Sequence, residues 1–210
     1  MHYMFDNIFN TMKKILITGG RLIEYILTGE SDFHLYSADG EIYEKVTDIY
    51  KAREVLKGMR EYLVGKFGME IKSPVIIELY SGDEFNLKGI WLQLKGVKGQ
   101  YHYENLGKNG MAHMIYLKKG MNKKKFKAIL AHELTHAFLR DQELMNCDRF
   151  FREGFARWVE YKTLIDLGLL EEADKIKHIK TWKRGKAVEE IFKIEKKVGI
   201  SGIMKALRKT

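Results

Sequence analysis

Apolar positions along the chain follow two periods. Between residues 47 and 66 they recur at helical spacing, which predicts a helix with one buried face. From Pro74 to Tyr80 they alternate with other positions, as in a half-buried strand. Further strands are predicted at residues 89–94, 100–103 and 112–117. The middle of the chain therefore predicts a small mixed β-sheet with a backing helix.

The chain is expected to have three parts. Residues 1–45 form an N-terminal extension, with an apolar helical stretch over residues 1–30 and a hairpin around Asp39-Gly40. Residues 46–140 form a subdomain with the sheet, and residues 141–210 form a mostly helical one. The fold class predicted from this order is α+β, with two lobes.

The helix predicted over Phe126 to Leu139 contains His132-Glu133-Leu134-Thr135-His136. Residues four apart share one face of a helix, so both imidazoles project the same way, one turn apart. Two such ligands suit tetrahedral Zn²⁺, and Glu133 can reach a water on the same metal. This HExxH arrangement predicts a zinc-dependent peptide hydrolase with Glu133 as general base. The alternative is a core helix whose histidines are satisfied by hydrogen bonds.

A catalytic zinc usually has three protein ligands and one open position. Glu153, 17 residues after His136, is the best candidate for the third ligand because it lies in a second predicted helix with an apolar face. Gly154 beside it would let this helix approach the first one closely. Glu143 and Asp148 are weaker candidates because they fall in the presumed connection. The alternative for Glu153 is an exposed helical carboxylate.

Other residues are candidates for supporting roles. The oxyanion formed during hydrolysis needs a further donor, for which Tyr161 is the first candidate and His178 the second. Glu160 shares a helix face with Glu153 and could support a histidine ligand. Two further histidines lie in predicted strands and are not expected to be ligands: His102 and His113.

The motif residues resemble a known family. His132-Glu133-Leu134-Thr135-His136, followed by Glu153-Gly154 on a second helix, resembles the gluzincin metallopeptidases. The chain is more closely similar to the peptidase domain of the plant LIM-domain, ubiquitin-activated growth-restricting proteins and to their short prokaryotic relatives. The matching residues are 129–140 and 153–154, and more loosely 62–65, 74–79 and 205–208.

This resemblance covers about residues 55–210. It implies a zincin-like fold, with His132, His136 and Glu153 as zinc ligands and Glu133 as base. A LIM domain needs many Cys and His ligands, and the chain has one cysteine. Ubiquitin-dependent activation is therefore not implied.

Composition and charge limit the binding partners and the cellular compartment that the sequence predicts. The net charge is +9, but the lysines are scattered and no nucleic-acid motif stands out, which favours a solvated basic surface. A preference for acidic partners or substrates is a third possibility, between nucleic-acid binding and a merely solvated basic surface. No apolar run reaches about 18 residues, so no membrane span is expected. A single cysteine, Cys147, fits a reducing compartment, and the protein is expected to be cytoplasmic.

The strand over residues 112–117 directly precedes the motif helix and is expected to form the sheet edge that lines the cleft. An exposed edge can pair with an extended peptide, so a protein or peptide substrate is predicted there. Two alternative functions remain. One is a zinc-binding but inactive module, which would not need Glu133, and the other is a nucleic-acid-associated regulatory protease. The sequence makes no prediction of the oligomeric state.

Overall fold

A computed structural model of the chain describes residues 44–81, 84–87, 90–93, 98–105, 110–144, 148–178 and 182–207. The chain divides into two compact units, residues 1–44 and residues 45–210. Nearly all described residues belong to the second unit. The helix predicted in residues 1–30 and the hairpin around Asp39-Gly40 lie outside the described residues.

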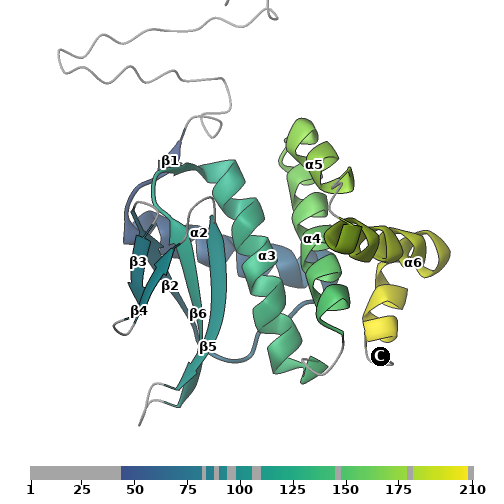
Figure 1. The fold of residues 1–210 in the computed structure, drawn as a ribbon, viewed down its shortest axis with the longest axis horizontal. Coiled ribbons are helices and arrows are strands. Elements are labelled where there is room, and N and C mark those ends of the chain that lie inside the picture. The colour runs from purple at the N-terminus through teal and green to yellow at the C-terminus, as the bar shows by residue number, and fades with distance from the viewer. Residues whose placement is uncertain are drawn as a thin grey trace, which may run out of the picture. The chain divides into compact units, whose positions relative to one another are not determined.

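The second unit combines helices with small sheets, as predicted (Figure 1). Its described elements in chain order are β1 (Lys45–Val46), α2 (Ile49–Phe67), β2 (Val75–Tyr80), β3 (Glu84–Leu87), β4 (Ile90–Gln93), β5 (Gly99–Asn105), β6 (Met111–Lys118), β7 (Met121–Asn122), α3 (Lys123–Asp141), α4 (Arg149–Asp166), α5 (Leu170–Lys177) and α6 (Trp182–Leu207). The last helix has a kink at Gly199, whose φ of 68° is in the left-handed region.

The main sheet has three strands in the order β2-β6-β5. β2 pairs parallel with β6, and β5 pairs antiparallel with β6. β6 is therefore central, and the expectation that residues 112–117 form the sheet edge is wrong. Those six consecutive residues are all buried, as in a strand covered on both faces. Among the described strands, β5 is the edge next to the motif helix.

The motif helix α3 is buried around most of its circumference. It begins after Asn122, whose side chain accepts hydrogen bonds from the backbone N–H groups of Lys124 and Lys125. Twelve of its 19 residues are buried. The helix packs against α4, α2, β5 and β6, and Figure 1 shows it between the sheet and α4.

Helix α4 lies between α3 and α6. The buried indole of Trp158 stacks on Phe155, and its Nε1–H donates to Glu195 in α6 at 2.8 Å. A Cβ on Gly154 would lie 2.6 Å from the carbonyl oxygen of Ala187 in α6. Gly154 therefore permits the close approach of α4 to α6, whereas the sequence suggested an approach to α3.

A buried polar network joins the sheet to the end of α3. Nε2 of His113 lies 2.9 Å from Asp141, and Nδ1 lies 2.9 Å from the Tyr101 hydroxyl. Asp141 also accepts hydrogen bonds from the backbone N–H groups of Lys72 and Ser73 and from the Ser73 hydroxyl. Burial lowers the pKa of His113, so the neutral ring donates from Nε2 and accepts at Nδ1. Both ring nitrogens are thus used inside the fold.

We expect Asp141→Ala to lower the free energy of unfolding by about 2–4 kcal/mol, because buried His113 and partly buried Ser73 would each lose an acceptor, and the exposed backbone N–H of Lys72 would lose one as well. Asp174→Ala is the control: Asp174 is 66% exposed and faces His178 on the same helix, so its loss should stay within about 0.5 kcal/mol. Urea denaturation of the metal-free proteins measures both. Equal losses in the two variants would contradict a structural role for the network.

Candidate functional site

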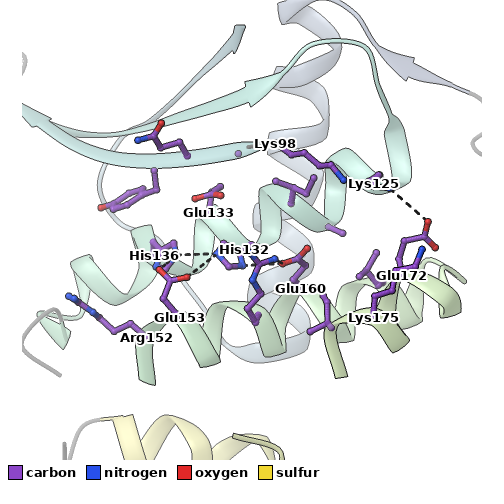
Figure 2. Close-up of a pocket in the computed structure, with 18 of the residues that line it drawn as sticks. Lys98, Lys125, His132, Glu133, His136, Arg152, Glu153, Glu160, Glu172 and Lys175 are labelled. Atoms are coloured by element: carbon purple, nitrogen blue, oxygen red, sulfur yellow. Dashed lines mark hydrogen bonds and ion pairs between the residues drawn. The ribbon is translucent and has the colours of Figure 1, made fainter. Parts of the chain in front are cut away.

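The two motif histidines face each other on α3. Their Nε2 atoms are 3.3 Å apart, and Figure 2 shows both rings directed into the same cleft. Ligand atoms of His132, Glu133 and His136 all lie within 4.8 Å of one another, so the group could hold a metal ion. Two imidazole nitrogens that converge on one point are a donor set that suits zinc.

Glu153 approaches the histidines from α4. Its Oε2 lies 3.9 Å from Nε2 of His132, and its Oε1 lies 3.6 Å from Nε2 of His136. Glu143 lies in the turn after α3, and Asp148 caps the first turn of α4. Neither of them lines the cleft. Of the three candidates for a third ligand, the structure brings Glu153 to the histidines.

Glu160 contacts the other nitrogen of His132. Its Oε2 lies 3.1 Å from Nδ1 of His132 and accepts a hydrogen bond from Arg157 at 2.7 Å. The contact with His132 is an ion pair by distance, without the alignment of a hydrogen bond. Glu160 lies seven residues after Glu153, nearly two full turns, so the two carboxylates share one face of α4. This is the position from which a carboxylate can orient a histidine ligand.

Burial and neighbouring charges together shift the pKa values of the three α3 groups in different directions. Burial lowers the pKa of His132, but the carboxylates of Glu160 and Glu133 outweigh it, and the pKa is raised. Burial and the positive charges of its neighbours lower the pKa of His136 to about 3. Burial raises the pKa of Glu133 to about 7. Neutral His136 is ready to bind a metal, and the carboxyl group of Glu133 can exchange a proton near neutral pH.

A cleft of about 820 Å³ connects these groups. Its walls come from the start of β5 and from α3, α4 and α5. A Cβ on Gly99 in β5 would lie 2.6 Å from Ile129 and 2.7 Å from Oε1 of Glu133. The backbone of the edge strand therefore passes directly over Glu133, and the missing side chain leaves room for its carboxylate.

Gly99 and Tyr101 are among the cleft residues that sequence reasoning missed. Tyr101 lines the cleft with its ring centroid 5.9 Å from that of His136. A glycine within a strand is a known sign of close backbone approach, but the predicted strand began at residue 100, so Gly99 fell just outside it. No feature of the sequence pointed to Tyr101, because its position beside His136 depends on the order of the strands in the sheet.

The structure does not bring Tyr161 or His178 to the cleft. Tyr161 packs edge-on against Phe192, with ring centroids 4.9 Å apart, and it lines a separate pocket with His178. Eight residues after Glu153 correspond to a rotation about 80° past two full turns of the helix, which directs Tyr161 away from the Glu153 face. The oxyanion donor suggested from sequence is therefore not among the cleft residues.

Comparisons with protein-family models, with curated proteins and with solved structures found no match to this chain. Within the described residues, no helix has the length and apolar character that a membrane span requires. What the site does must be inferred from its own residues.

On the zinc site that the sequence predicts, replacing both motif histidines, as His132→Ala/His136→Ala, should abolish zinc retention, because two of the three expected ligands are removed. Glu160→Gln should keep the donors but weaken zinc affinity about 10–100-fold, because the carboxylate at Nδ1 of His132 is lost. Elemental analysis and competition with a chromogenic chelator measure both effects. His178→Ala, outside the cleft, is the control. Full zinc retention in the double variant would contradict the assignment.

Proposed function

We propose that this protein is a zinc-dependent metallopeptidase with a gluzincin-like centre in a zincin-like two-lobe fold. The observation that supports this most strongly is the convergence of His132, His136 and Glu153 from two helices, with buried Glu133 beside them in an open cleft. Two imidazoles and one carboxylate are a common donor set of hydrolytic zinc. In this proposal the sheet, α2 and α3 form one lobe, and α4 to α6 form the other.

His132, His136 and Glu153 would hold the zinc, which when bound lowers the pKa of a water molecule and polarises the scissile carbonyl group. Glu133 takes a proton as general base and donates it to the leaving amine. Its pKa near 7, raised by burial, suits transfer in both directions. Glu160 keeps the His132 ring oriented from the Nδ1 side, which leaves Nε2 free for ligation.

The substrate in this proposal is an extended protein or peptide segment along β5. β5 is the edge strand beside the motif helix, and Gly99 to Tyr101 line the cleft. Backbone N–H and C=O groups on an unpaired strand edge can bind a peptide without reading much of its sequence. β5 replaces the strand over residues 112–117 in this role, because that strand is central.

An inactive zinc-binding module is the alternative that uses the same three ligands. Such a module has no need of a buried carboxyl group next to the ligands. Glu133 is 6% exposed and its burial raises its pKa, which costs free energy in the ionised form. A carboxyl group that is buried next to the ligands at a cost in free energy is more typical of an enzyme than of a binding module.

We expect Glu133→Gln to retain zinc and the fold but to lower kcat/KM by about 10²–10⁴-fold, because the amide has the same shape and cannot accept the proton. A fluorescently labelled unfolded protein serves as substrate, with zinc content measured on the same samples. Glu190→Gln is the control, since Glu190 is exposed on α6. Hydrolysis at the native rate by Glu133→Gln would refute the general-base role. Lack of hydrolysis by the native zinc-loaded protein would favour the inactive module.

Gly99→Ala should lower kcat/KM at least about tenfold with normal zinc content, because the added methyl group collides with Glu133 and Ile129. Gly65→Ala is the matched control, because a Cβ there meets nothing within 4 Å and the site is helical. The same labelled substrate and circular dichroism test both variants. Unchanged kcat/KM in Gly99→Ala would mean that β5 and Glu133 can separate freely.

A further inference from the structure

Three lysines gather at one end of the cleft, each from a different element. Lys98 directly precedes β5, Lys125 lies in the first turn of α3, and Lys175 lies in α5. Figure 2 shows these side chains around the end of the cleft that lies away from Arg152, beyond His132 and Glu160. Residues far apart in the chain thus build one positively charged site.

The positive charge of this site is only partly compensated. Glu172 is the carboxylate beside the lysines, and its Oε1 lies 3.9 Å from Nζ of Lys125. No carboxylate of the described residues lies within ion-pair distance of Lys98 or Lys175. Burial lowers the pKa of Lys98, and the charges of Lys125 and Lys175 lower it further, whereas the carboxylate of Glu160 partly opposes this shift. An anion placed among these ammonium groups would relieve their mutual repulsion.

The geometry of the elements sets the distance from this site to the candidate zinc ligands. Lys125 precedes His132 by seven residues, which corresponds to about 10 Å along the helix axis. An extended peptide advances about 3.4 Å per residue. A peptide that follows β5 passes Lys98, which directly precedes Gly99, the residue whose backbone lies over Glu133. A side chain of the bound peptide that lies two to four residues from the cleaved bond would reach the lysines.

On the basis of the proposed peptidase function, we propose that Lys98, Lys125 and Lys175 form a subsite for an acidic side chain of the substrate. The Asp or Glu recognised there lies about two to four residues from the scissile bond. Ammonium groups on flexible stems recognise a charge rather than one fixed geometry, so both acids fit. Lys or Arg at the same substrate position is disfavoured by repulsion.

A set of peptides tests the subsite. An uncharged parent peptide is compared with variants that carry a single Asp at each position on both sides of the cleaved bond. With zinc-loaded protein, we expect one position, two to four residues away on one side, to raise kcat/KM about tenfold, the size of a charge-assisted hydrogen bond in a partly desolvated groove. Cleavage of all peptides with no preference for Asp at any position overturns the subsite and leaves the peptidase proposal standing.

Charge-reversal variants distinguish a change in substrate recognition from general damage to the protein. Lys98→Glu/Lys175→Glu should invert the preference, so that Lys at the sensitive position is cleaved faster than Asp. Lys57→Glu/Lys196→Glu carries the same change in net charge on exposed positions of α2 and α6 outside the cleft, and should keep the preference for Asp. An unchanged preference in the first variant, or an inverted one in the second, overturns the assignment.

Binding gives a readout that does not depend on turnover. Fluorescence anisotropy with the Glu133→Gln protein compares the best-cleaved Asp peptide, or each single-Asp peptide of the set if none is cleaved, with the uncharged parent peptide. We expect about tenfold tighter binding of the acidic peptide, and this difference should shrink as salt is raised. Acid-selective binding without any hydrolysis supports the subsite while refuting the peptidase proposal. Equal affinities for the acidic and uncharged peptides overturn the subsite.

Discussion

The burial of α3 is the constraint on which the rest of the site depends. A helix packed against a sheet and two other helices normally carries apolar side chains around its whole circumference. This one instead carries His132 and Glu133 in its buried part, each 6% exposed. Polar groups in such a place must be paired or must bind something, because leaving them unpaired costs about 1–3 kcal/mol each. The structure meets this demand with Glu160 on one side of His132 and with the open cleft on the other.

Three neighbouring groups on one helix acquire different proton affinities because burial and the charges around them act differently on each group. His132 lies next to Glu160 of α4, His136 has positively charged neighbours, and Glu133 lies under the backbone of β5 at Gly99. The pKa of the first histidine rises, that of the second falls, and that of the carboxyl group approaches neutrality. Separation of this kind is how a site assigns ligand and proton-transfer roles to similar residues.

The sequence predicted those parts of the site that depend on helix periodicity. The pairing of His132 with His136 follows from a spacing of four residues, and the position of Glu160 follows from its spacing of seven from Glu153. The order of the strands in the sheet could not be predicted from local periodicity, because the parallel pairing of β2 with β6 joins residues about 38 positions apart. The sequence nevertheless carried a sign that this strand is not an edge, since all of residues 112–117 except His113 are apolar or aromatic, which is typical of a central strand.

Helix α6 shapes the site although none of its described residues lines the cleft. Gly154 allows the backbone of α6 to lie against α4 directly next to Glu153. On the next turn, Trp158 is held by Glu195 of α6 and packs on Phe67 of α2. α4 is therefore fixed from both sides, and its carboxylates have one position relative to the histidines of α3. A donor set divided between two helices can be precise only where packing sets their separation, so residues that never line the cleft determine its geometry.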